Sequence, residues 1–241
     1  MTGMSSSTNE AWMARARREV PPRKLEKQLA MVHAACGVFG REGYARASVD
    51  AIATAAGVST RTLYNHFPGG KAQLFQTVVT WTAHEVRDAQ LARIRTLLDP
   101  ARLPTADTLE RDLVAVAQAF TDLISEYPNH FALVRHIHSE ADHVPGEVLD
   151  AWQQAGPAPV AAALAAALTA LADGGLLDLH GDAALATGHF TALSSASILL
   201  RSHYGVLPLP RDETDRLLRG GVAAFLRAYR RTGEAAAADG A

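Results

Sequence analysis

The stretch SVDAIATAAGVSTRTLYNHF, residues Ser48–Phe67, decides the fold. It predicts two short helices, 48–56 and 59–67, joined by a turn at Gly57. Ser48 and Ser59 each stand where a hydroxyl can cap the first amides of a helix. Helices this short are not stable alone, so both must pack on a preceding helix. The pattern is typical of a helix-turn-helix, in which the second helix enters the major groove of DNA.

The second helix of this motif has a predicted reading face. Since Leu63 and Phe67 form its buried side, the exposed side carries hydroxyl, guanidinium and amide groups, which suit base edges and phosphates. Arg61 is the best candidate for a bidentate contact to guanine. The residues predicted to contact DNA are Ser48, Ser59, Thr60, Arg61, Tyr64, Asn65, His66 and Lys71. The alternatives are a solvated helix face and, for Tyr64, packing on the core of the motif.

The rest of the chain is predicted to be helical as well. Alanine, the best helix former, supplies 47 of the 241 residues, and no segment alternates with the period of a strand. An interruption is expected inside 146–173, at Gly156, Pro157 and Pro159, because proline cannot continue a helix interior. The other predicted helices are 23–39, 71–98, 106–126, 129–142, 182–204 and 211–231. The fold class is therefore all-α.

Charge and composition narrow the class of protein. Residues 11–75 carry a net charge of +6, whereas residues 76–241 carry −7, which favours a polyanionic partner for the first part only. The single cysteine, Cys36, excludes an internal disulfide and suits a reducing cytoplasm. Val160–Ala172 is the most apolar run and is shorter than the roughly 20 residues that a membrane span needs. We expect a cytoplasmic protein without a membrane partner.

Residues Lys24–Val79 resemble the DNA-binding domain of TetR-type (TetR/AcrR) transcriptional regulators. The resemblance rests on Ala34-Ala35, Phe39, Gly43-Tyr44, the run from Ser48 to Ala53, Ala55–Ser59, Leu63–Phe67, Lys71, Leu74 and Phe75. One departure is Pro68-Gly69-Gly70, which is one residue longer than the common form before the lysine.

The resemblance implies a homodimer that binds a palindromic DNA operator and responds to a small molecule. We expect no cofactor. We therefore expect a ligand-responsive repressor, released from DNA by a small hydrophobic effector. The expected division is a flexible basic arm (1–20), a helix-turn-helix domain (21–70), a ligand-binding and dimerisation domain (71–232) and a disordered tail (233–241).

Two further sets of residues follow from that expectation. The helix 71–98 is predicted to link the recognition helix to an effector pocket. For the residues that would line this pocket, the alternative is ordinary core packing. The predicted pocket residues are Trp81, Phe120, Phe131, Trp152, His189 and Phe190. Apolar and small residues on the last two long helices predict the dimer interface, formed by Leu185, Ala192, Ala196, Leu199, Leu217, Gly221 and Phe225.

Several alternatives stay open at this point. Arg15, Arg17 and Arg18 are either an arm that reaches a DNA minor groove or a solvated tail. The histidines and acids between His130 and His143 suggest a metal site, but only pairs share a helix face, so no metal is expected. An enzyme is disfavoured, because the G-x-S-x-G and H-E-x-x-H motifs are absent. A DNA-binding protein without effector response remains the main alternative.

Overall fold

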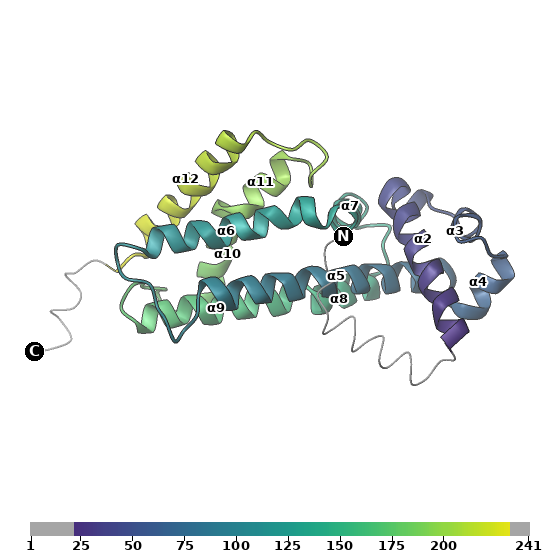
Figure 1. The fold of residues 1–241 in the computed structure, drawn as a ribbon, viewed down its shortest axis with the longest axis horizontal. Coiled ribbons are helices and arrows are strands. Elements are labelled where there is room, and N and C mark those ends of the chain that lie inside the picture. Colours follow the sequence, from purple (N-terminus) through teal and green to yellow (C-terminus); the bar gives the residue numbers. More distant parts are fainter. Residues whose placement is uncertain (1–21, 232–241) are drawn as a thin grey trace, which may run out of the picture. The chain divides into compact units, whose positions relative to one another are not determined.

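The computed structural model describes residues 22–231, with side chains from Glu26 onward. The predicted arm at 1–20 and tail at 233–241 lie outside the described residues. The described chain forms two compact units, one from residues 22–89 and 127–158 and the other from residues 90–126 and 159–231. Every regular element in them is a helix (Figure 1), which confirms the all-α prediction.

The first unit contains the predicted helix-turn-helix. It is built from α2 (Pro22–Arg46), α3 (Val49–Ala55), α4 (Thr60–His66) and the first part of α5 (Gly70–Leu97), with α7 (Pro128–Ser139) and α8 (Gly146–Ala155). Figure 1 shows α2, α3 and α4 gathered around the beginning of α5.

Aromatic and aliphatic side chains hold these helices together. Phe39 on α2 meets Phe75 on α5 edge to face, with ring centroids 4.8 Å apart. Ile52 on α3 and Leu63 on α4 are completely buried, as the predicted inner faces require. Burying an aliphatic side chain stabilises a fold by about 1.5–3 kcal/mol, so the two short helices depend on this shared core.

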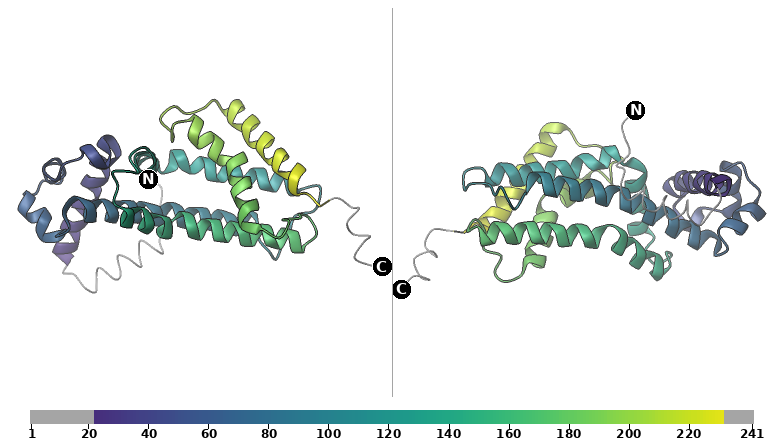
Figure 2. Two further views of the ribbon diagram at one scale, coloured as in Figure 1. Left: turned by 180° about the vertical axis from the view of Figure 1, so that it is seen from behind. Right: turned by 60° about the horizontal axis from the view of Figure 1, so that its bottom comes forward.

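The second unit contains the end of α5 and most of α9 (Pro157–Asp173). It also contains all of α6 (Leu109–Glu126), α10 (Ala183–Leu193), α11 (Ser195–Arg201) and α12 (Arg211–Tyr229). Its core is one continuous apolar cluster that includes Leu113, Leu164, Phe190 and Phe225. Figure 2 shows α12 beside α10, with which it packs closely.

Two predicted elements differ from the structure. The segment predicted as one helix, 182–204, breaks at Ser194 into α10 and α11, whose axes differ by 42°. The stretch Gly146–Asp173, which includes α8 and α9, is long and apolar enough to cross a membrane, contrary to the prediction that no stretch reaches that length. Core helices of soluble proteins share this property, and Leu164, Leu168 and Leu171 of α9 are buried.

Candidate DNA interface

Side-chain caps fix both helices of the motif. The Ser48 hydroxyl accepts a hydrogen bond from the Ala51 amide (3.0 Å), and the Ser59 hydroxyl accepts one from the Thr62 amide (3.1 Å). These are the caps that the sequence predicts. Because a hydroxyl that accepts one hydrogen bond can still donate another, Ser48 retains a donor suited to a phosphate.

The outer face of α4 presents three side chains to solvent. The side chains of Arg61 and Asn65 are exposed and make no hydrogen bond or ion pair with another described residue. Tyr64 is 47% exposed, and its ring lies against the backbone of Gly70. These three side chains, which we call the reading face, are available to a partner.

Two other predicted contact residues have roles inside the unit. The Thr60 hydroxyl donates to Asp50 Oδ1 (2.8 Å), so its proton is engaged between α4 and α3. The sequence analysis misses this pairing, which joins residues ten positions apart on two different helices. His66 is half-buried at the end of α4. Neither residue is as free to contact DNA as the reading face.

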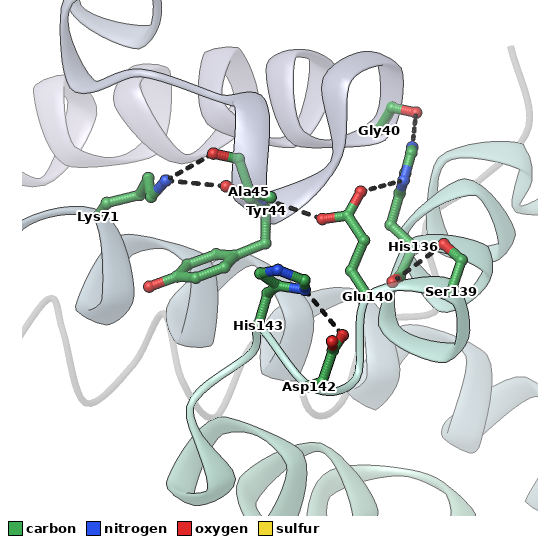
Figure 3. A network of polar contacts seen from close by, with 9 residues as sticks. All are labelled: Gly40, Tyr44, Ala45, Lys71, His136, Ser139, Glu140, Asp142 and His143. Atoms are coloured by element: carbon green, nitrogen blue, oxygen red, sulfur yellow. Dashed lines mark hydrogen bonds and ion pairs between the residues drawn. The ribbon is translucent and has the colours of Figure 1, made fainter.

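Lys71, which is predicted to contact DNA, binds backbone oxygens of its own unit in the structure. Its ammonium donates to the carbonyl oxygens of Tyr44 (2.9 Å), Ala45 (3.3 Å) and Ala47 (3.1 Å). It also lies 4.6 Å from the centroid of the Tyr44 ring. An ammonium has three donors, and all three are used here. Lys71 therefore stabilises the turn before α3 through hydrogen bonds to its carbonyl oxygens (Figure 3).

The predicted effector-binding residues divide between the two units. Trp81, Phe131 and Trp152 belong to the first unit, whereas Phe120, His189 and Phe190 belong to the second. Phe120 and Phe190 are members of the apolar core there, and His189 Nδ1 is 2.6 Å from the Tyr229 hydroxyl. These two phenylalanines therefore pack as ordinary core residues, which is the alternative to a role in the pocket wall.

Trp81 lines a groove between α2 and α5 in the first unit. The groove has a volume of about 290 Å³ and mixed polar and apolar walls, formed by Leu29, Val32, Gln73, Gln76, Thr77, Thr80, Trp81 and His84. Burial, followed by the charge of Arg87, lowers the pKa of His84, which favours a neutral ring at this wall. Trp152 is buried, and its indole Nε1 has no hydrogen-bond partner among the described residues.

Two residues predicted at the dimer interface face the core of their own subunit. Phe225 is completely buried, with ring centroids 5.3 Å from Phe190 and 4.7 Å from Tyr229. A Cβ on Gly221 would overlap the Leu193 carbonyl oxygen, so this glycine allows α12 to approach the break after α10. A fully buried ring cannot contact a second subunit.

The other members of the predicted dimer set remain accessible in the second unit. Leu185, at 54%, is a strongly exposed apolar side chain on α10. Ala192 is exposed, and Ala196, Leu199 and Leu217 are partly exposed. The accessible members of the predicted set therefore lie on α10 and α11 and, at Leu217, near the beginning of α12, rather than around Phe225.

The region from His130 to His143 forms internal contacts. His130 is buried and its Nδ1 is 3.2 Å from the Thr82 hydroxyl; burial lowers its pKa to about 4. Its ring is therefore neutral at neutral pH. Among residues 22–231, no three His, Cys, Asp or Glu side chains lie close enough to hold a metal ion.

A capped helix-turn-helix with an exposed polar recognition helix, followed by further helices, defines a DNA-binding regulator of the helix-turn-helix class. Residues 31–78 match the family described as bacterial regulatory proteins, tetR family. Residues 111–231 match the C-terminal domain of AefR-like transcriptional repressors. The chain belongs to the TetR family of transcriptional regulators, whose members combine a DNA-binding domain with a C-terminal ligand-binding domain and are not enzymes.

Individual relatives agree with this assignment. The HTH-type transcriptional regulator CymR of Pseudomonas putida is 30% identical over 110 residues, which cover 46% of this chain and about half (51%) of CymR. A TetR-family regulator from Mesorhizobium loti MAFF303099 is 27% identical, with a TM-score of 0.66, over 87% of this chain and 100% of that one. The flavonoid-responsive regulator FrrA is 25% identical, with a TM-score of 0.58, over 85% of this chain and 97% of FrrA.

Proposed function

We propose that the protein is a repressor that binds a palindromic operator as a homodimer and is released by a small hydrophobic effector. The observation that carries the proposal is the reading face of α4, where Arg61 and Asn65 are exposed and without partners among the described residues. DNA reading is assigned to residues 21–70, and effector binding and dimerisation to residues 71–232. As a regulator that acts on DNA, the protein works in the cytoplasm.

The DNA contacts in this proposal fall into two groups. Arg61 and Asn65 read base edges, since guanidinium and amide groups form bidentate pairs with guanine and adenine. Ser48, Tyr64 and the amides near Ser59 contact the sugar-phosphate backbone, which positions the motif without reading sequence. Thr60, whose hydroxyl also binds Asp50, and His66 complete the proposed set of DNA contacts.

The repressor and effector parts of the proposal draw on relatives. The C-terminal match is to a repressor domain, and FrrA is described as flavonoid-responsive. By analogy, a flat, largely apolar aromatic compound is the effector class to test first. Coupling between effector and operator sites is typically about 1–3 kcal/mol, a 5- to 150-fold change in operator affinity.

The test begins with selection of bound duplexes from a random library, which yields the operator and its symmetry. Operator affinity of Arg61→Ala is then compared with that of Arg95→Ala, a control that removes an exposed arginine from α5. Loss of a base-reading arginine should weaken the free energy of operator binding by about 1–3 kcal/mol and reduce the base preference at one position of the operator. The control should bind as the wild type does. Equal affinity and base preference for Arg61→Ala would show that the reading face is assigned wrongly.

The effector part is tested on the same operator at fixed salt, with flavonoids and other apolar aromatic compounds. A compound that binds the protein should weaken operator binding. If compounds bind the protein but leave its operator affinity unchanged, the protein is a DNA-binding protein without effector response, and the effector part of the proposal is wrong.

A further inference from the structure

The turn between α2 and α3 sets the position of the recognition motif. It runs from Gly43, where the backbone leaves the helix of α2, to Ser48, the cap of α3. Because α4 follows α3 after a short turn, a shift of this segment displaces both helices of the motif. The groups that hold the turn therefore influence how α4 meets DNA.

Two charged side chains reach this turn from elements outside the motif. Lys71, on α5, binds its carbonyl oxygens, as described above. Glu140 follows the last residue of α7, and its Oε2 accepts a hydrogen bond from the Ala45 amide (2.8 Å). Ala45 is thus held at its amide by an anion and at its carbonyl by a cation, one on each side of the turn (Figure 3).

Gly43 makes room for the Glu140 carboxylate. A Cβ at this position would overlap Glu140 Oε1 and would lie 2.7 Å from His136 Nδ1. The backbone angles of Gly43, φ 78° and ψ 176°, belong to a region that is essentially restricted to glycine. The carboxylate therefore occupies the space that any other residue would fill.

His136 fixes the carboxylate in turn. Its Nδ1 is 3.3 Å from Glu140 Oε1 and its Nε2 is 3.2 Å from the Gly40 carbonyl oxygen. Both partners are acceptors, so both contacts are hydrogen bonds when the ring carries two protons. The side chains of His136 and Glu140 are 9% and 15% exposed, so this contact is largely shielded from solvent.

We propose that Glu140 is a positioning residue for operator recognition, which ties the end of α7 to the turn that sets α3 and α4. This inference rests on the proposed DNA-binding function. Glu140 acts through the backbone of Ala45 and not on DNA itself. Its removal should therefore reduce discrimination between the operator and other sequences, because base contacts need an accurate placement of α4 and backbone contacts tolerate a looser one.

The experiment measures affinity for the selected operator and for a randomised duplex of equal length, at one salt concentration, using full-length variants. Glu140→Gln keeps an oxygen for the Ala45 amide and nearly the same shape, whereas Glu140→Ala removes both. Asp142→Ala is the matched control, since Asp142 lies two residues further on, is 79% exposed and, within residues 22–231, pairs only with His143 (2.7 Å). Circular dichroism establishes that each variant is folded at the temperature of measurement.

We expect Glu140→Ala to lose about tenfold in operator affinity, the worth of one hydrogen bond to a charged group, with little change for the random duplex. Glu140→Gln should lose less, and Asp142→Ala should bind as the wild type does. His136→Gln should add little to Glu140→Gln in the double variant, because both act through one contact. Amide exchange at residues 45–47 should quicken in Glu140→Ala.

Three results overturn the inference. The first is a folded Glu140→Ala with wild-type operator affinity. The second is an equal loss for operator and random duplex, which assigns Glu140 to overall stability. If Glu140→Ala does not fold, the near-isosteric Glu140→Gln decides the question. The third refuting result is then a Glu140→Gln variant that distinguishes the operator from the random duplex as well as the wild type does and shows unchanged amide exchange at residues 45–47. Failure of the wild-type protein to bind any duplex would instead refute the proposed function.

Discussion

Alanine substitutions at Gly220 and Gly221, which are adjacent on α12, should have opposite effects on the stability of the fold. Gly220 is exposed, and a Cβ there would meet no atom within 4 Å. At Gly221 the same Cβ would lie 2.6 Å from the carbonyl carbon of Leu193 and 3.2 Å from the Cα of Ser194. These are backbone atoms at the break between α10 and α11, so they cannot rotate away.

The difference in stability between the two variants follows from two effects. Replacing glycine by alanine inside a helix stabilises it by about 0.5–1 kcal/mol, and this gain is common to both variants. Carbon atoms prefer separations of about 3.5–4.0 Å, so Gly221→Ala must push α12 away from α10 by about 1 Å. Overpacking of this kind costs about 1–3 kcal/mol, and we place the cost at the upper end because backbone must move.

The two variants should therefore differ by about 3 kcal/mol, or roughly 6–12 °C in the thermal midpoint for a chain of this size. Thermal and urea unfolding at one fixed protein concentration measure the difference, because the proposed dimerisation would make stability depend on concentration. Equal stability of the two variants would refute the packing argument. If Gly221→Ala were stable but monomeric, the glycine would lie at the dimer interface, as its sequence position suggests.

Three further predictions concern other parts of the chain. Lys71→Met should lower the free energy of unfolding by about 1.5–3 kcal/mol while leaving the salt dependence of operator binding unchanged; a smaller slope would reinstate the phosphate contact. His130 stays neutral in the fold down to about pH 4, whereas an unfolded histidine takes up a proton near pH 6.5. Stability should therefore fall by about 3 kcal/mol between pH 6.5 and 4, and urea titrations of His130→Phe should show a flatter profile over that range. Leu185→Glu should yield folded monomers in sedimentation, and a folded dimer would move the interface elsewhere.

The local features of the fold follow from the sequence. Ser48 and Ser59 cap the helices that they were predicted to cap, and α8 ends at Ala155, directly before the predicted interruption at Gly156. Each of these depends on groups a few residues apart, so the pattern of residue types contains the information.

Features set by distant residues do not follow from the sequence. Glu140 binds Ala45 across 95 residues of chain, and neither position is distinctive in the pattern. The break at Ser194 has no glycine or proline beside it; it coincides with the approach of Gly221 from another helix. The apolar stripe of α12 predicts a buried face correctly, yet it cannot tell whether a core or a second subunit covers Phe225.

The distribution of α5 between both compact units affects how the DNA-reading part could be exchanged among regulators. A cut after Gly70 would separate Phe39 from Phe75 and the turn before α3 from Lys71. A graft that keeps the recognition helix in its native setting therefore needs two pieces of chain, residues 22–89 and residues 127–158. A hybrid regulator made by a single crossover at the edge of the helix-turn-helix would inherit α4 without the side chains that hold it in place.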